Sequence, residues 1–329
     1  MPILFHGTSH PELAKKIAKK YKFKVGACDI KKFSGGETYV RLLEDVRRKE
    51  TYIVQTITSA VNDDFMEILF LADALRRHDA REITLIIPHF GYARQDRRAA
   101  MGETISARVI ANLLVNAGVT RVITCDLHSD QIEGFFSVPV DNLHCYTVFA
   151  RYFKKKRLKN LVVVAPDAGA AHIARRIAFL LKAPIAVLHK RRPGHHQVEH
   201  THVVGDVHGK TALLFDDMID TAGTTCASYE QLIKQGAGEI YAVATHGIFS
   251  GSAYERLKKV NFKEIVVTDT LPIEGKRLSN LTVLPIEDIL KKVENKKDVF
   301  LNISRGLFES IVVISSDFER DLRVYSFPS

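Results

Sequence analysis

Residues 212–225 constrain the fold more than any other stretch of this chain. Ala212 to Phe215 are four apolar residues that end abruptly in two aspartates, as a buried parallel strand does at its carboxyl end. A turn rich in threonine follows around Gly223, and a helical pattern then runs to Lys234. The stretch therefore predicts a strand, a tight turn and a helix N-terminus, which is the recurring unit of an α/β fold.

The predicted turn suits a ligand with two different ends. Free backbone N–H groups and the helix dipole favour an anion at the helix N-terminus, and threonine hydroxyls can add hydrogen bonds. Asp216, Asp217 and Asp220 would repel a phosphate but can accept hydrogen bonds from a diol. Ribose 5-phosphate has such a shape, with a phosphate at one end and hydroxyl groups at the other. Two acids after a strand are also typical of a solvated loop, or of a Mg²⁺ site in another α/β fold, so the acids alone do not decide.

Strands and helices alternate through both halves of the chain. A length of 329 residues predicts two domains. Asp126 ends a predicted strand in the first half, and Asp167 and Asp216 end predicted strands in the second. We therefore predict an α/β fold with two similar doubly wound parallel sheets and a domain boundary near residues 141–147.

Charge and cysteine content narrow the class of protein. The net charge of +9 suits an anionic partner, but no basic stripe is interleaved with aromatic residues, so we expect polyphosphate substrates and no nucleic acid. The four cysteines lack metal-ligand spacing, which predicts reduced thiols and no zinc site. No apolar run approaches the ~20 residues of a membrane span, so we expect a cytoplasmic protein without membrane contact.

Three further segments carry charge where a ligand would bind. Residues 90–98 form a cation-rich loop after the predicted strand 83–87, and His128 follows another predicted strand. Residues 189–210 are predicted to be a long irregular connection, typical of a lid, and Lys190-Arg191-Arg192 at its start suits a polyphosphate. Taken singly, the loop is more typical of an exposed charged surface, and a lone histidine after a strand is more often structural than catalytic. The six histidines of the lid segment leave transition-metal binding as a minor alternative.

In combination these motifs resemble the class I ribose-phosphate pyrophosphokinases, from about residue 3 to about residue 309. The resemblance rests on Phe90 to Arg98, Asp126 to Ser129 with Gln131 to Phe136, Pro166 to Gly169, Lys190 to Pro193, and Asp216 to Thr224. It implies two domains of the type I phosphoribosyltransferase-like fold. Residues 1–143 would form the ATP side, residues 144–309 would carry the ribose 5-phosphate loop and the lid, and residues 310–329 would be an extension of unknown role.

The implied reaction transfers the β,γ-diphosphoryl group of ATP to the 1-hydroxyl of ribose 5-phosphate. It gives phosphoribosyl diphosphate and AMP, and serves nucleotide biosynthesis. The resemblance also implies Mg²⁺ as cofactor, inorganic phosphate as an activator, and a homo-oligomer in which dimers assemble into a hexamer.

The resemblance further assigns roles to individual residues. Ribose 5-phosphate would be held by Asp216, Asp217, Asp220, Thr221, Ala222, Gly223, Thr224 and Thr225. ATP would be held by Phe33, Gly35, Glu37, Arg94, Gln95, Asp96 and His128. The diphosphate loop would be Asp167, Ala168 and Gly169, with Mg²⁺ placed by His128 and Asp167. Catalysis would fall to Lys190, Arg192 and His128, the two lid cations closing over the transition state.

The chain departs from the family pattern at two places. Gly35 stands where the family usually has Asp, so a carboxylate that would read the adenine amino group is missing and donor selectivity is in question. Ala99 to Glu103 is shorter and less basic than usual, which puts phosphate activation and ADP inhibition in question. Two alternatives remain: a phosphoribosyltransferase, against which the ATP-side motifs argue, and a non-catalytic regulatory subunit, which would be expected to lose His128 or the lid cations.

Overall fold

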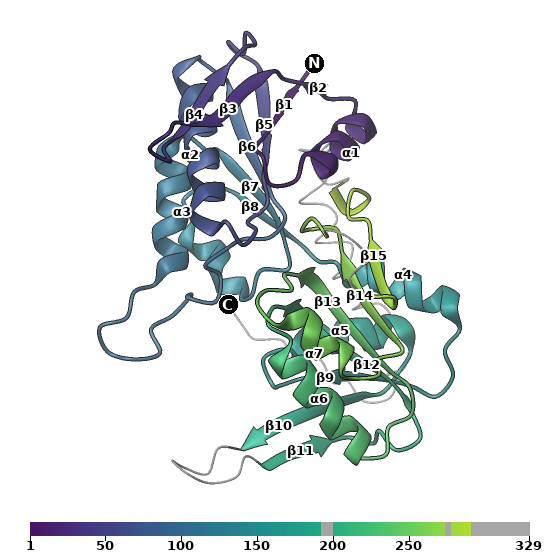
Figure 1. The fold of residues 1–329 in the computed structure, drawn as a ribbon. Coiled ribbons are helices and arrows are strands. Elements are labelled where there is room, and N and C mark those ends of the chain that lie inside the picture. Colours follow the sequence, from purple (N-terminus) through teal and green to yellow (C-terminus); the bar gives the residue numbers. More distant parts are fainter. Residues whose placement is uncertain (192–199, 274–277, 291–329) are drawn as a thin grey trace, which may run out of the picture. The chain divides into compact units, whose positions relative to one another are not determined.

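Two sheets organise the chain, one built within residues 3–143 and the other within residues 161–284 (Figure 1). The computed structural model describes residues 1–191, 200–273 and 278–290. Both sheets belong to one unit, Met1–Glu287, and a second unit begins at Asp288. The predicted extension 310–329 lies outside the described residues.

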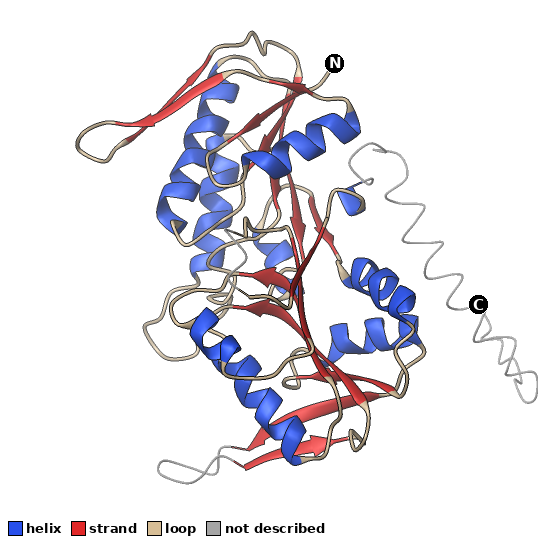
Figure 2. Cartoon of the chain, turned by 45° about the vertical axis from the view of Figure 1, so that its right-hand side comes forward, coloured by secondary structure: helices blue, strands red, loops and turns tan. Residues whose placement is uncertain are grey.

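The first sheet is parallel throughout and has the strand order β2-β1-β5-β6-β7-β8. Its strands are β1 (Ile3–His6), β2 (Lys24–Val25), β5 (Glu50–Val54), β6 (Glu82–Ile87), β7 (Arg121–Cys125) and β8 (Val140–Leu143). Its helices are α1 (Pro11–Tyr21), α2 (Val61–Arg77), α3 (Ser106–Ala117) and the short 3₁₀ helix η1 (Asp130–Phe135). Helices α2 and α3 lie side by side against this sheet, as both cartoon views show (Figures 1 and 2). The buried stripe of α2, spaced three or four residues apart, explains this packing: Phe65, Ile68, Leu71, Ala72 and Leu75.

A separate antiparallel hairpin projects between β2 and β5 in the sequence. It pairs β3 (Cys28–Lys32) with β4 (Thr38–Leu42), and its turn carries residues 33–37. Lys32 Nζ lies 2.5 Å from Asp63 Oδ2 at the start of α2, so the end of the hairpin is tied to the same unit.

The second sheet has the order β11-β10-β9-β12-β13-β14-β15 and is parallel except for the edge strand β11. Its strands are β9 (Leu161–Ala165), β10 (Ile185–Arg191), β11 (His200–Val204), β12 (Thr211–Ile219), β13 (Ile240–Gly247), β14 (Glu264–Thr268) and β15 (Leu281–Leu284). Its helices are α4 (Tyr146–Lys156), α5 (Ala171–Leu181), α6 (Gly223–Lys234) and α7 (Ala253–Lys258).

Alternation along β12 buries both faces of the second sheet. Leu214 belongs to the buried cluster that includes Leu232 of α6 and Leu257 of α7. Its neighbour Phe215 points to the opposite face, where its ring packs edge-on against Phe149 of α4 at 5.4 Å. A strand covered by helices on both faces needs a continuous apolar run, which is what residues 212–215 provide.

The predicted fold class is confirmed, with two corrections to its elements. The strand predicted to stop at Phe215 continues to Ile219, because Asp216 and Met218 still pair with β13. In the segment 189–210, predicted to be irregular, residues 189–191 and 200–204 instead belong to the antiparallel pair β10–β11, whereas residues 205–210 lie outside strands and helices and residues 192–199 are not described. The boundary at residues 143 and 144 stays a prediction.

Among the described residues, no helix is long and apolar enough to cross a membrane.

Candidate active site

The carboxyl-terminal parts of β9 and β12 bring acidic side chains together, and the loop after β7 adds His128 to them. A cavity of about 250 Å³ opens there, next to the turn that the sequence assigns to ribose 5-phosphate. Its lining is Arg94, His128, Asp167, Asp216, Asp217, Met218, Asp220, Thr221, Ala222, Gly223, Thr224 and Thr225. All eight residues of the predicted ribose 5-phosphate set are therefore brought together around one space.

The turn itself has the geometry of an anion site. Ala222 has a φ of 60°, in the left-handed region, and it caps α6 without a side-chain hydrogen bond. The first backbone N–H groups of α6 are therefore left for a ligand, and the helix dipole favours a negative charge there. Asp220 directly precedes this turn, and its Oδ1 accepts a hydrogen bond from Ser250 Oγ.

The neighbouring acids Asp216 and Asp217 differ in their electrostatics. Burial raises the pKa of Asp216 well above its usual value, and the charge of Asp217 raises it further. Burial is the largest single influence on Asp217 and opposes its ionisation, but the hydrogen bond with His128, the charge of His128 and the hydrogen bond with Asp216 together outweigh burial and lower the pKa of Asp217. His128 Nδ1 lies 2.7 Å from Asp217 Oδ2, and this hydrogen bond is the main reason that the pKa of His128 is raised. Asp217 and His128 are thus held as an ion pair beside an acid that retains its proton more readily.

A second cavity of about 380 Å³ begins where the first ends. The two share four residues: His128, Asp167, Asp216 and Asp217. The second cavity is completed by Arg97, Gly169, Ala170, His172, Ile173 and Phe215. Asp167 Oδ1 also accepts a hydrogen bond from the backbone N–H of Ala170 at 3.0 Å, which closes the predicted diphosphate loop onto itself.

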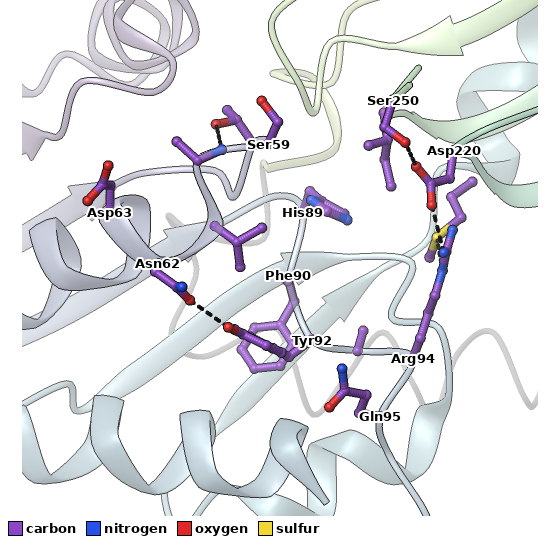
Figure 3. A pocket seen from close by; sticks show the side chains of 17 residues that line it. Ser59, Asn62, Asp63, His89, Phe90, Tyr92, Arg94, Gln95, Asp220 and Ser250 are labelled. Carbon is purple, nitrogen blue, oxygen red and sulfur yellow. Dashed lines mark hydrogen bonds and ion pairs between the residues drawn. The ribbon is translucent and has the colours of Figure 1, made fainter. Parts of the chain in front are cut away.

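A third cavity, of about 710 Å³, lies between residues 58–63, residues 89–95 and the second sheet (Figure 3). Arg94 lines both this cavity and the first. Its guanidinium donates to Asp220 Oδ2 at 2.7 Å and contacts Met218 Sδ at 3.1 Å, so the arginine forms the wall between the two spaces. Figure 3 shows the Arg94 side chain pointing toward the Asp220 carboxylate, with a dashed line marking their ion pair.

The residues predicted to hold ATP fall into two groups. Arg94 and Gln95 line the third cavity, His128 lines the first two, and Asp96 accepts a hydrogen bond from Gln131 at 2.8 Å nearby. Phe33, Gly35 and Glu37 lie instead in the turn of the β3–β4 hairpin and line none of the three cavities. The Phe33 side chain is 51% exposed and contacts the ring of Tyr39 at 5.5 Å.

Only one of the two predicted lid cations lies among the described residues. Lys190 lies in β10, and Arg192 lies outside the described residues.

Three residues near the site received no individual role from the sequence. Arg97 and His172 line the second cavity, and Asp126, two residues before His128, is buried. Arg97 could have been found from the basic loop 90–98, and His172 from its place in the first turn of a helix after the predicted diphosphate loop. No sequence signal shows that Asp126 turns inward.

The donor set around the first two cavities fits magnesium. The carboxylates of Asp167, Asp216 and Asp217 are hard oxygen donors, which Mg²⁺ prefers. Among the described residues, no group of three or more His, Cys, Asp or Glu side chains is arranged to hold a metal ion by itself. Magnesium usually binds through one or two carboxylates and substrate phosphates, and the cavities offer that arrangement.

The fold and the site together are those of an α/β enzyme of the phosphoribosyltransferase type, with an open helix N-terminus beside cavities lined by acids. Comparison with known proteins gives the family. Residues 2–118 match a family model described as the N-terminal domain of ribose phosphate pyrophosphokinase, and residues 194–295 match the phosphoribosyl synthetase-associated domain.

Full-length relatives agree with these matches. A ribose-phosphate pyrophosphokinase from Bacillus subtilis is 44% identical, over 91% of this chain and 96% of the relative. One from Fusobacterium nucleatum is 42% identical, over 90% and 96%. The crystal structure of phosphoribosylpyrophosphate synthetase from Mycobacterium smegmatis superposes with a TM-score of 0.85 at 40% identity, covering 92% of this chain and 99% of that one. The chain belongs to the ribose-phosphate pyrophosphokinase family.

Proposed function

We propose that this enzyme transfers the β,γ-diphosphoryl group of ATP to the 1-hydroxyl of ribose 5-phosphate, releasing AMP. Two adjoining cavities that share four residues carry the proposal. The reacting atoms of two anionic substrates must meet at one point, and the shared wall of His128, Asp167, Asp216 and Asp217 is where a sugar in one cavity meets a diphosphoryl group in the other.

The first cavity orients the sugar. The turn 221–225 takes the 5-phosphate at the start of α6, and Asp216 and Asp217 accept hydrogen bonds from the ribose hydroxyls. This places the 1-hydroxyl toward Asp167 and the second cavity. Because phosphoryl transfer depends mainly on positioning and on stabilising charge, fixing the sugar at both ends supplies much of the catalysis.

The second cavity takes the group that is transferred. Asp167, Ala168 and Gly169 form its diphosphate loop, and Asp167 is the residue best suited to hold magnesium. Bound magnesium would offset the charge on the phosphates and polarise the phosphorus that is attacked. His128 is better placed to donate from Nε2 to a phosphate than to bind the metal, because its Nδ1 is bonded to Asp217 and magnesium prefers oxygen.

Lys190 and Arg192 supply the remaining positive charge. Cations that approach the phosphates as the lid closes stabilise charge that is largest in the transition state, and each such donor is worth roughly 3 kcal/mol. Arg94, Gln95 and Asp96 contribute to the ATP side, and Phe33, Gly35 and Glu37 are kept as ATP contacts from the sequence resemblance.

Three further expectations belong to the same proposal: a homo-oligomer of dimers assembled into a hexamer, activation by inorganic phosphate, and a cytoplasmic location. The rival readings, a phosphoribosyltransferase or a regulatory subunit, are not favoured, since relatives named ribose-phosphate pyrophosphokinase match about nine-tenths of the chain.

The deciding experiment is AMP release from ATP and Mg²⁺, with and without ribose 5-phosphate, while inorganic phosphate is titrated. AMP that depends on the sugar supports the proposed reaction, and stimulation by phosphate supports the regulatory expectation. A folded preparation that releases no AMP under any of these conditions would refute the function.

A further inference from the structure

His172 is the side chain in the second cavity whose position calls for a role. It lies in the first turn of α5 and lines the cavity together with Asp167 and Gly169 of the diphosphate loop. Its ring Nδ1 is 2.8 Å from the carbonyl oxygen of Gly169. A carbonyl oxygen can only accept, so Nδ1 carries a proton and acts as the donor.

This contact decides what the other ring nitrogen can do. With Nδ1 turned to the loop, Nε2 is the nitrogen left for a ligand, and among the described residues it has no hydrogen-bond partner. When the ring carries a second proton, Nε2–H becomes a donor with positive charge behind it. The same contact fixes the ring against the loop, so the donor is held in place before a ligand arrives.

The charge in the second cavity shows which ligand needs this donor. Asp167, Asp216 and Asp217 all line it, and His128 is already paired with Asp217. Among the described residues that line the cavity, Arg97 and His172 are therefore the ones left to offer positive charge to a polyphosphate. The start of α5 adds to them, because its N-cap Ala170 offers no side chain to the first N–H groups of the helix.

We propose that His172 donates a hydrogen bond from Nε2–H to a non-bridging oxygen of the diphosphoryl group that this enzyme transfers. The inference rests on the proposed function and extends it, because it assigns the contact to the β,γ-phosphates and to no other part of either substrate. Ile173 and Ala174, the next residues of α5, offer no polar side chain that could replace it.

The contact can be isolated with two nucleotides that differ in the group His172 would bind. The nucleotide α,β-methylene-ATP carries the β- and γ-phosphates but cannot release AMP, and AMP lacks both phosphates. Binding of each, with Mg²⁺, is measured by calorimetry on the full-length protein. His172→Ala is expected to weaken α,β-methylene-ATP roughly 10- to 100-fold, as for loss of a charge-assisted hydrogen bond, and to leave AMP within about twofold.

A matched control is available in the first half of the chain. His78 is also exposed, and its Nδ1 also lies 2.8 Å from a carbonyl oxygen, that of Ala74, but it lines none of the three cavities. His78→Ala is expected to bind both nucleotides as the wild type does.

A second variant separates the charge from the tie to Gly169. His172→Lys keeps a cation at the site but loses the ring, so it should recover at least part of the affinity for α,β-methylene-ATP. If His172 served only to hold the loop, lysine would behave like alanine, and AMP would weaken along with the analogue. Either result would overturn the proposal, as would unchanged analogue binding in His172→Ala. Should the alanine variant fail to fold, His172→Gln provides the uncharged comparison with lysine.

The proposed function is tested separately, by AMP release from the wild type in the presence of ribose 5-phosphate. Its absence would refute the reaction itself. Its presence, together with normal analogue binding in His172→Ala, would refute only the role of His172.

Discussion

Asp126 is the residue whose loss should tell most about how the site is held together. It is 2% exposed, and its backbone is in the left-handed region with a φ of 38°. Its Oδ2 accepts hydrogen bonds from Cys145 N at 3.0 Å and from Thr245 Oγ1 at 2.6 Å, and its Oδ1 lies 3.1 Å from His144 Nδ1. The carboxylate therefore ties the loop that carries His128 to β13 of the second sheet.

The expected cost of Asp126→Ala follows from these contacts. Removing the carboxylate leaves two buried donors, Cys145 N and Thr245 Oγ1, without a partner, at about 1–3 kcal/mol each. Alanine also tolerates the left-handed backbone less well than aspartate. For Asp126→Ala we expect the free energy of unfolding to fall by roughly 3–6 kcal/mol and the melting temperature to fall by roughly 10 °C. Asp126→Asn keeps an acceptor oxygen and the tolerance of positive φ, so its loss should be about 1–2 kcal/mol.

Thermal unfolding followed by circular dichroism measures the melting temperatures of Asp126→Ala and Asp126→Asn, with Asp29→Ala as the control. Asp29 forms a half-exposed pair with Lys31 on the hairpin, so its loss should be small. The kcat of Asp126→Ala, measured well below its melting temperature, should also fall, because the backbone that positions His128 is released. A melting temperature for Asp126→Ala equal to that of Asp29→Ala would refute the idea that this carboxylate joins the two sheets.

Three shorter predictions test the charged groups of the site. Arg94→Ala should raise the KM for ATP about tenfold with little change in melting temperature, because its half-exposed pair with Asp220 adds at most about 1 kcal/mol of stability; an unchanged KM would contradict its place on the ATP side. Lys190→Ala should lower kcat roughly 100-fold, and a change confined to KM would exclude a transition-state role. The pKa of His128 is raised by Asp217, so their pairing stabilises the fold below about pH 6.5 and is lost as pH rises through the higher folded pKa. The wild type should therefore lose more melting temperature between pH 6 and pH 9 than His128→Gln does, and parallel curves would show that the pair adds nothing.

The sequence predicts those elements of the fold that depend on a local pattern of apolar and polar residues. The run from Ala212 to Phe215 had to be a buried strand because four apolar residues precede acids and a threonine-rich turn, and β12 is that strand. Its true end at Ile219 was not readable, because Asp216 and Met218 stay in the sheet by pairing with β13. That pairing is a tertiary contact, whereas the polar side chains in the local sequence indicate that the strand has already ended.

The site was predictable to a similar depth. Strand ends carry the acids, and parallel strands bring their carboxyl ends to one edge, so Asp167 and Asp216 could be placed together in advance. The pairing of Arg94 with Asp220 could not, because 126 residues separate them and nothing local to either indicates the other. Asp126 has the same acid-after-strand signature as Asp216, but neighbouring donors from another strand turn it inward.

Gly35 offers a test of the one predicted ATP segment that the three cavities leave out. A Cβ added at this position would meet no atom within 4 Å, so Gly35→Asp should fold as the wild type does. The family resemblance places there a carboxylate that reads the adenine amino group. If Phe33 and Glu37 contact ATP in the active assembly, the added carboxylate should favour ATP over GTP by roughly tenfold in kcat/KM, as one extra hydrogen bond would.

The matched control is Gly102→Asp, since Gly102 lies in an exposed turn that is also free of neighbours within 4 Å. Its φ of 85° makes that substitution the more strained of the two, so any loss of stability should appear there and not at Gly35. An ATP-to-GTP ratio that Gly35→Asp leaves unchanged, in a protein of normal activity, would remove the hairpin from the nucleotide site. The donor base would then have to be read by the loop that contains Arg94 and Gln95, inside the third cavity.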